Sequence, residues 1–320
     1  DGGLQESGKE EPMSYTTNIK NEILNNEYNK TEQISELSAI ININGEIENN
    51  SISLYTENIG VSRRIYKLLK DIFNIEINIT KEEINRLNKN FIIHMTIKED
   101  VEKILKTLDL YDYTNNTRKY KPSDYICGNI EEKKSYLRGA FLICGSVNDP
   151  KTSRYHLEFI IENKITANYI NDLLQELNFN SKILKREKHY MVYLKESERI
   201  SDFIKLLNAY NSLFYYEDIR IYRDHKNMTN RLNNCEQANI DKIVFSSNEQ
   251  LENIQKLKQR EDFDLIDDKI KEVCIYKEKY PESSMQELAD IISLETNTKI
   301  TKSGINHRFR KIKEMVSQKH

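Results

Sequence analysis

The strongest chemical signal in the chain lies near its C-terminus, between Lys299 and Lys313. This window contains six lysines and arginines and no acidic residue. Cationic side chains bind DNA phosphates, and guanidinium and amide groups can also hydrogen-bond to base edges. The window therefore predicts a DNA-binding element, and the alternative is an ordinary solvated basic face.

These side chains predict two kinds of DNA contact. Arginine suits guanine and asparagine suits adenine, so we expect bases to be read from the outer face of a helix. The predicted base-reading residues are Ser303, Asn306, His307 and Arg310. The predicted phosphate contacts are Lys299, Lys302, Arg308, Lys311 and Lys313.

Two helices are expected to position these residues. Ser284 and Glu287 form a capping-box pattern that opens the first helix, and Ser303 can cap the second. The second helix has an apolar face at i, i+4, i+7 and i+11, formed by Ile305, Phe309, Ile312 and Val316. This pattern predicts a helix-turn-helix whose second helix enters the major groove. The polar segment Ser293–Thr301 between them is longer than the usual turn of about 3–4 residues.

Two other basic clusters leave two interpretations open. The first lies on a predicted hairpin and contains Lys182, Lys185, Arg186 and Lys188, followed by His189. It either tracks a DNA backbone or is a solvated hairpin tip. The second contains Arg220, Arg223, His225, Lys226 and Arg231, and the same two readings apply to it.

The sequence shows no recognisable catalytic constellation. The six histidines are dispersed, and there is no H-E-x-x-H, G-x-S-x-G or glycine-rich phosphate loop. The four cysteines contain no C-x-x-C pair, so reduced thiols are expected rather than zinc ligands or disulfides. We therefore expect no enzyme, no cofactor, no metal and no small-molecule substrate.

Composition indicates a globular protein with several domains. Of the 320 residues, 38% are apolar and 31% are charged, and the formal net charge is -3. Residues 1–12 resemble an unstructured leader, and from Met13 onward acidic and basic residues are equal in number, so only local charge is informative. No apolar run approaches the ~20 residues of a membrane span, and no signal peptide follows Met13, so a cytoplasmic location is expected.

The hydrophobic pattern predicts a repeat of about 100 residues, too long for a solenoid unit. Each copy reads helix, strand, helix, two strands, helix. The first copy is expected at 31–45, 47–55, 63–73, 75–79, 91–97 and 101–108, and the second, after a polar loop at 112–123, at 131–144, 155–161, 167–177, 181–186, 189–195 and 200–207. The predicted segments are a leader at 1–12, halves at 13–111 and 124–229, a helical connector at 230–262 and a helix-turn-helix domain at 263–320.

Residues 37–45 and 137–145 both resemble the LAGLIDADG helix of homing endonucleases. The small side chains of Ala39, Gly139 and Ala140 would let two such helices pack closely. In that family the last acidic residue of each motif binds the catalytic metal. Here these positions are Asn44 and Cys144, which lack the anionic oxygen that a hard cation prefers. Metal-dependent cleavage is therefore not expected.

The whole pattern is similar to the WhiA family of bacterial regulators. The matching blocks are residues 138–141, 145–150, 230–239 and 302–311. The resemblance implies an α+β fold with two pseudo-symmetric LAGLIDADG-like αββαββα halves, followed by an all-α helix-turn-helix domain. It also implies a regulator of cell division, chromosome segregation and sporulation that binds double-stranded DNA at the nucleoid, with other regulators or RNA polymerase components as partners.

Two alternatives remain open from the sequence. One is an active metal-dependent DNA endonuclease that uses unrecognised acidic residues. The other is a protein-binding adaptor of the division machinery.

Overall fold

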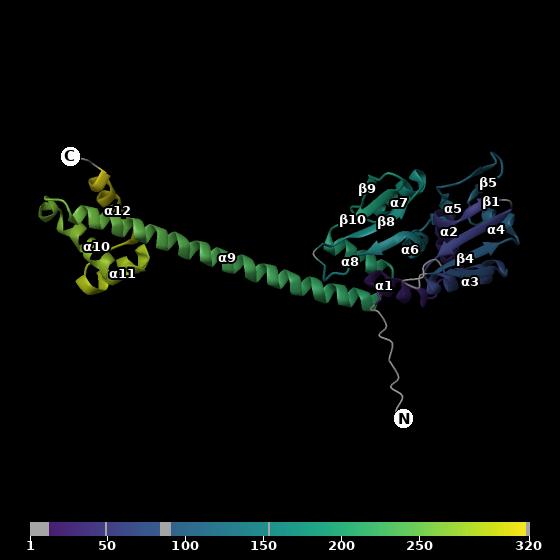
Figure 1. Ribbon diagram of the computed structural model, residues 1–320, viewed down its shortest axis with the longest axis horizontal. Coiled ribbons are helices and arrows are strands. Elements are labelled where there is room, and N and C mark those ends of the chain that lie inside the picture. Colours follow the sequence, from purple (N-terminus) through teal and green to yellow (C-terminus); the bar gives the residue numbers. More distant parts are fainter. Residues whose placement is uncertain (1–12, 49, 84–90, 153, 318–320) are drawn as a thin grey trace, which may run out of the picture. The chain divides into compact units, whose positions relative to one another are not determined.

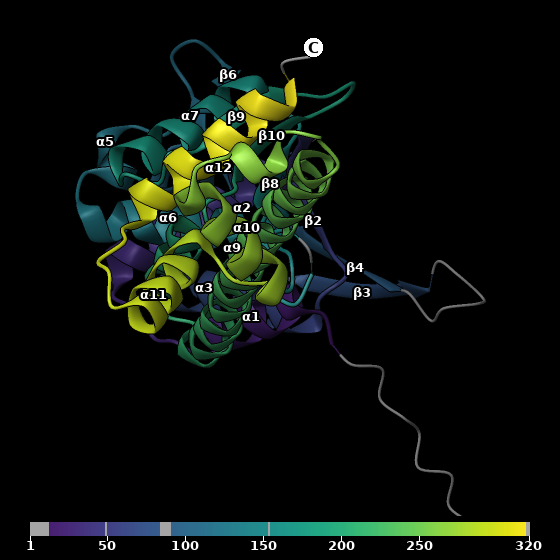
Figure 2. The same cartoon turned by 90° about the vertical axis from the view of Figure 1, so that its left-hand side faces the viewer.

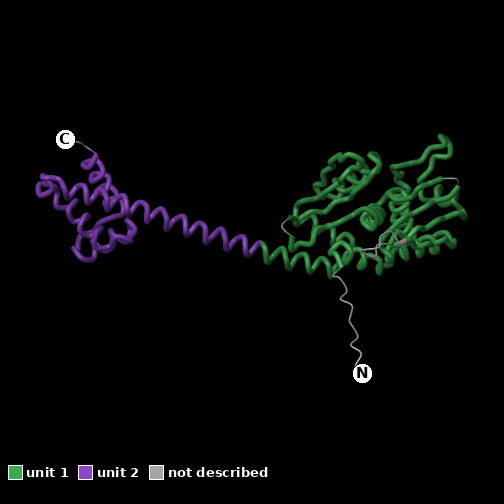
Figure 3. Tube along the Cα trace, viewed as in Figure 1, with its two compact units in different colours: residues 1–223 green, residues 224–320 purple. Residues whose placement is uncertain are grey.

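The computed structural model describes residues 13–48, 50–83, 91–152 and 154–317, so the predicted leader 1–12 lies outside the described residues. Contacts divide the chain into two compact units, with the boundary between Arg223 and Asp224 (Figure 3). Each unit has its own hydrophobic core. We describe the units separately.

The first half of unit 1 contains one four-stranded antiparallel sheet in the order β1-β2-β4-β3. Its elements are α1 (Tyr15–Leu24), α2 (Lys30–Asn44), β1 (Glu46–Glu48), β2 (Ser51–Thr56), α3 (Ile59–Phe73), β3 (Asn78–Glu83), β4 (Phe91–Ile97) and α4 (Val101–Thr107). Strands β1 and β4 of this sheet are labelled in Figure 1. The single strand predicted at 47–55 is a hairpin of β1 and β2. The chain reverses near Asn50, whose φ is 56°, a left-handed conformation that asparagine tolerates better than most residues.

The second half repeats this connectivity with a sheet in the order β7-β8-β10-β9. Its elements are α5 (Asp124–Cys127), α6 (Ile130–Cys144), β7 (Gly145–Val147), β8 (Leu157–Ile161), α7 (Lys164–Glu176), β9 (Lys182–Lys185), β10 (Tyr190–Leu194) and α8 (Ser197–Leu206). A two-stranded ribbon of β5 (Tyr111–Asp112) and β6 (Thr117–Arg118) occupies part of the predicted polar loop. The predicted pseudo-symmetric α+β halves are therefore confirmed.

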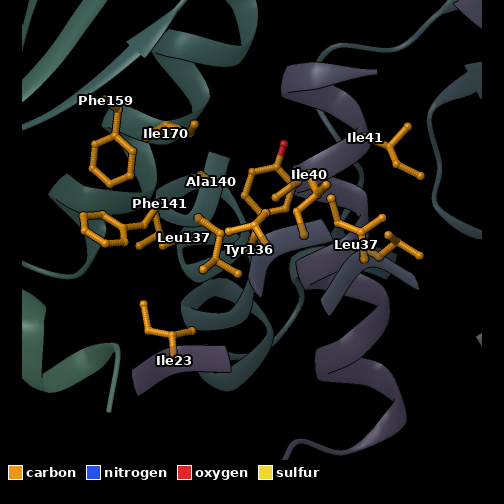
Figure 4. Packing of buried hydrophobic residues seen from close by; sticks show 14 of the residues in the cluster. Ile23, Leu37, Ile40, Ile41, Tyr136, Leu137, Ala140, Phe141, Phe159 and Ile170 are labelled. Atoms are coloured by element: carbon orange, nitrogen blue, oxygen red, sulfur yellow. The ribbon is translucent and has the colours of Figure 1, made fainter. Parts of the chain in front are cut away.

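Helices α2 and α6 pack against each other at the centre of unit 1. Leu37 and Ile40 of α2 and Leu137 and Ala140 of α6 are fully buried in one cluster (Figure 4). A Cβ atom added to Gly139 would clash with the carbonyl oxygen of Glu36 and lie 3.0 Å from the Ala39 Cβ atom. The prediction that small residues allow these helices to approach closely is confirmed.

A buried ionic cluster joins the two halves across this packing. Glu36 on α2 accepts hydrogen bonds from Arg64 of α3 (Nε–Oε1 2.8 Å) and Arg138 of α6 (Nε–Oε2 3.0 Å). The side chains of Glu36, Arg64 and Arg138 are 0%, 3% and 2% exposed. The Arg138 guanidinium also stacks on Tyr28, with Cζ 3.3 Å from the ring centroid. Since buried charges need counter-charges, Glu36 is the acceptor that both guanidiniums require.

Helix α9 (Tyr210–Lys258) begins in unit 1 and ends in unit 2, so the predicted connector is the continuation of a helix that starts earlier. Residues 224–245 of α9 are all exposed. Unit 2 continues with a short 3-10 turn, η1 (Phe263–Leu265), followed by α10 (Asp268–Lys279), α11 (Met285–Thr296) and α12 (Lys302–Ser317). Ile254 and Leu257 at the end of α9 share one core with α10, α11 and α12. Figure 2 shows α10, α11 and α12 from the side that faces the viewer.

Candidate nucleic-acid interface

The first helix of the predicted helix-turn-helix begins at a complete capping box. The Ser284 hydroxyl accepts a hydrogen bond from the Glu287 amide (3.2 Å), and the Glu287 carboxylate accepts one from the Ser284 amide (2.7 Å). Hydrogen bonds that Ser284 donates to the Glu287 carboxylate, first from its backbone amide and then from its side chain, lower the pKa of Glu287. The predicted capping box is confirmed, and it fixes the start of α11 against the core through Leu288 and Ile292.

The turn between α11 and α12 is shorter than the sequence suggests. The helix continues to Thr296, so the connection is Asn297–Thr301 rather than Ser293–Thr301. Ser293 lies inside α11, where its hydroxyl donates to the Ala289 carbonyl oxygen (2.7 Å) and accepts from the Ile300 amide (2.9 Å). The predicted long loop was therefore wrong. The hydrogen bond between Ile300 and Ser293 holds the turn against α11.

The residue that caps α12 is Thr301, not Ser303. The Thr301 hydroxyl accepts from the Gly304 amide (3.2 Å), and the Thr301 carbonyl accepts from the Ile305 amide (3.0 Å). Ser303 therefore lies within the first turn of α12, where its side chain is exposed. The predicted cap was wrong by two positions. The Ser303 hydroxyl nevertheless lies on the exposed surface of the helix.

Helix α12 separates an apolar face from a polar one. Ile305, Phe309 and Ile312 are buried in the core of unit 2, and Val316 packs against it. The predicted base-reading residues Ser303, Asn306, His307 and Arg310 are all exposed on the same helix, as are Lys302, Lys311 and Lys313, and Lys299 is exposed in the preceding turn. The structure therefore brings eight of the nine predicted DNA-contacting residues to one exposed region.

Two of the predicted phosphate contacts already have acidic partners. Arg308, whose side chain is 17% exposed, pairs with Glu272 of α10 (3.2 Å). Lys313, whose side chain is 62% exposed, pairs with Glu249 of α9 (2.5 Å). Arg308 is held between helices, whereas the more exposed Lys313 can exchange Glu249 for a phosphate at little cost.

A groove of about 210 Å³ runs between the end of α9 and α12. From α9 it is lined by Ser246, Glu249, Gln250 and Asn253, and from α12 by Asn306, Phe309, Arg310, Ile312 and Lys313, with Met285 of α11. The α9 side of this groove was not predicted, because no local sequence pattern places α9 beside α12. The sequence feature that marks this side is the helical spacing of the polar residues Ser246, Gln250 and Asn253 beside the buried Ile254 and Leu257.

The basic cluster that was predicted on a hairpin lies on the β9–β10 hairpin of the structure. Lys182 and Lys185 lie on β9, the edge strand of its sheet, and Arg186 and Lys188 lie in the turn that follows. All four side chains are exposed, and the turn is closed by a hydrogen bond from the Arg186 amide to the His189 carbonyl (2.8 Å). This surface belongs to unit 1, whereas α12 belongs to unit 2.

The third basic cluster is divided by the structure. Arg220 pairs with Glu217 of the same helix (2.7 Å) and with Glu198 of α8 (3.6 Å), and Arg223 donates to the carbonyl oxygens of Pro150 (2.8 Å) and Thr152 (2.7 Å). These two arginines anchor the start of α9 to unit 1. In contrast, His225, Lys226 and Arg231 are exposed along α9.

Neither side chain is anionic at the two positions predicted to correspond to the metal ligands of LAGLIDADG motifs. The Asn44 side-chain oxygen accepts from the Tyr55 amide (2.9 Å), and burial raises the pKa of the Cys144 thiol to about 12. Burial also lowers the pKa of Lys20, which lies near Cys144 and 5.7 Å from the Phe141 ring centroid. Across residues 13–317, apart from the undescribed gaps, no group of three His, Cys, Asp or Glu side chains is arranged to hold a metal.

The open face of the first sheet is acidic. This face lies opposite the buried Ile52, Leu54 and Met95, and the strand registers place Glu46, Glu48 and Glu82 on it together with Tyr55, His94 and uncharged residues. Among the described residues of β1 to β4, this face presents no lysine or arginine. Such a face repels phosphate rather than attracting it.

Among the helices described here, none is long and apolar enough to cross a membrane.

Three domain profiles of one family match the chain in sequence order. The WhiA N-terminal LAGLIDADG-like domain matches residues 30–111, the WhiA LAGLIDADG-like domain matches residues 133–226, and the WhiA C-terminal HTH domain matches residues 229–316.

Full-length relatives show the same similarity. The chain is 37% identical over 316 residues to the "Probable cell division protein WhiA" of Enterococcus faecalis, covering 96% of this chain and 98% of the relative. It is 38% identical over 314 residues to the protein of the same name from Bacillus mycoides, covering 96% and 97%. The crystal structure of full-length DUF199/WhiA from Thermatoga maritima has the same fold, with a TM-score of 0.57 at 22% identity and coverage of 96% and 98%.

Proposed function

The chain belongs to the WhiA family, and from this premise we propose that it is a sequence-specific DNA-binding regulator without nuclease activity. The observation that carries the proposal is the exposed polar face of α12, which lies opposite its buried apolar face in a capped helix-turn-helix. The relatives' name supports a role in cell division, and we extend the proposal to chromosome segregation and sporulation. The site of action would be the nucleoid, with other regulators or RNA polymerase components as partners.

The proposed mechanism assigns the two kinds of contact to different side chains. Helix α12 would lie in the major groove, with Arg310 bonding to a guanine and Asn306 to an adenine edge. Ser303 and His307 would contact neighbouring bases. Phosphate contacts are assigned to Lys299, Lys302, Lys311 and Lys313, and to Arg308 only where it can leave Glu272.

The proposed absence of cleavage rests on the chemistry of the two motif ends. A hard divalent cation needs anionic oxygen ligands, and Asn44 and Cys144 supply an amide and a protonated thiol. The nearby Lys20 amine supplies no anionic oxygen either. Incubating plasmid DNA with the protein and Mg²⁺ or Mn²⁺ tests this, and cleavage that a chelator abolishes would contradict it.

DNA binding is tested by titrating labelled DNA fragments with the full chain at several salt concentrations. We expect binding that weakens as salt rises, because lysine and arginine contacts release counterions. Arg310→Ala should cost about 1–3 kcal/mol on the preferred site and relax specificity at one base position. The matched control is Lys226→Ala, which removes an exposed cation from α9. Salt-independent binding, or equal effects of the two substitutions, would contradict the proposal.

A second candidate function for unit 1 is favoured by its acidic first sheet. Glu46, Glu48 and Glu82 make this face unsuited to DNA, so unit 1 is the better candidate for an adaptor that binds protein. The chain truncated after Arg260 tests this. Retained DNA binding by that fragment would argue against an adaptor role for unit 1.

A further inference from the structure

The end of α9 lies beside the proposed reading helix rather than behind it. Ser246, Gln250 and Asn253 follow one another at i, i+4 and i+7, so they share one face of α9. All three are half-buried at the groove shared with Asn306 and Arg310. Any DNA that reaches Arg310 must therefore pass close to this face.

We infer that this face of α9 forms a second wall of the DNA interface, in which Gln250 and Asn253 donate hydrogen bonds to backbone phosphates beside α12. This inference rests on the proposed function, because it assumes that α12 occupies the major groove. An element packed along the flank of a reading helix faces the strand that borders the groove, and carboxamide groups are common donors to phosphate oxygens. The contact is neutral, so it adds affinity without releasing counterions.

Glu249 gives the same wall an electrostatic function. Its carboxylate holds Lys313 at 2.5 Å in the free protein, and it lies on the groove beside the carboxamides. When a DNA phosphate approaches, it competes with the Glu249 carboxylate for the Lys313 ammonium group. Glu249 therefore weakens binding to any DNA and reduces the counterion release that Lys313 contributes.

The test measures dissociation constants of the full chain for one preferred and one unrelated DNA fragment, each at several salt concentrations. Gln250→Ala and Asn253→Ala should each weaken both complexes roughly two- to tenfold, since each removes one neutral hydrogen bond, and the salt slope should not change. Lys313→Ala should weaken both complexes and lower the slope by about 1. Glu249→Gln should tighten both complexes roughly two- to fivefold and steepen the slope.

Matched controls come from the same helix. Gln255→Ala and Glu252→Gln remove the same chemical groups from exposed positions outside the groove, and neither should alter affinity or slope. Thermal unfolding checks each variant, and we expect no change because none of these side chains lies in the core of unit 2.

The outcomes separate this inference from the function on which it depends. Salt-dependent binding that Arg310→Ala impairs, together with wild-type behaviour of the Gln250, Asn253 and Glu249 variants, would overturn the inference alone. A salt slope that falls with Gln250→Ala would also overturn it, because a neutral donor cannot change counterion release. Failure of the unmodified chain to bind any DNA would overturn both.

Discussion

Replacing Glu36 with glutamine should destabilise unit 1 more than any surface substitution. The change keeps the size of the side chain but removes the carboxylate to which both buried arginines, Arg64 and Arg138, are hydrogen-bonded. Breaking a buried ion pair by removing one partner costs about 3–5 kcal/mol. Whole domains have about 5–15 kcal/mol of stability, so a large share of the stability of unit 1 depends on this carboxylate.

The assay is hydrogen exchange read by mass spectrometry, because it reports each unit separately. Amides of α2, α3 and α6 should exchange faster by the factor that corresponds to about 3–5 kcal/mol, whereas amides of α11 and α12 should be unchanged, since the two cores share no residue. The control is Glu102→Gln, which breaks an exposed i, i+4 pair with Lys106 and should cost about 0.5 kcal/mol or less.

Equal effects of Glu36→Gln and Glu102→Gln would refute the reasoning, because they would show that the cluster is solvated or already neutral. Arg138→Met supplies an independent check. It leaves Glu36 paired with Arg64 and removes the excess positive charge, so it should cost less than Glu36→Gln.

Three other predictions concern packing, thiol chemistry and capping. Gly139→Ala should destabilise unit 1 by about 1–3 kcal/mol or more in urea unfolding, because its methyl group would meet the Glu36 carbonyl. Alkylation at pH 8, followed by peptide mass spectrometry, should modify the exposed Cys235 first and leave Cys144 unmodified far longer, since its pKa of about 12 keeps the thiol protonated. Ser284→Ala should lower the stability of unit 2 by about 1 kcal/mol and leave unit 1 unchanged. Hydrogen exchange read by mass spectrometry, which reports each unit separately, would show this difference.

The spacing of apolar residues along the chain predicted those helices and strands that pack one side against a core. Ile305, Phe309 and Ile312 defined α12 because a helix in a core repeats its apolar positions every three or four residues. Helix α1 was missed although Tyr15, Ile19 and Ile23 show the same spacing and are all buried. The polar residues between these three positions mask the apolar spacing.

Other features could not be read from local sequence. Thr301 and Ser303 are equally suitable caps, and only the backbone geometry of the turn selects Thr301. The contact of Gln250 with the α12 groove, and the pairing of Glu36 with Arg138, join residues far apart in the chain. Such pairs depend on tertiary packing, which a single sequence does not display.

The pairing of Glu36 with Arg138 makes the second half depend on the first. By the motif alignment, Glu36 corresponds to Tyr136 in the other half, and Arg138 corresponds to Ser38. In a homodimer of first halves, each Glu36 would still have the Arg64 of its own half as counter-charge. In a homodimer of second halves, Arg138 would be buried against tyrosine without a carboxylate. The second half therefore requires the first as its partner, whereas the first half does not need the second for charge balance.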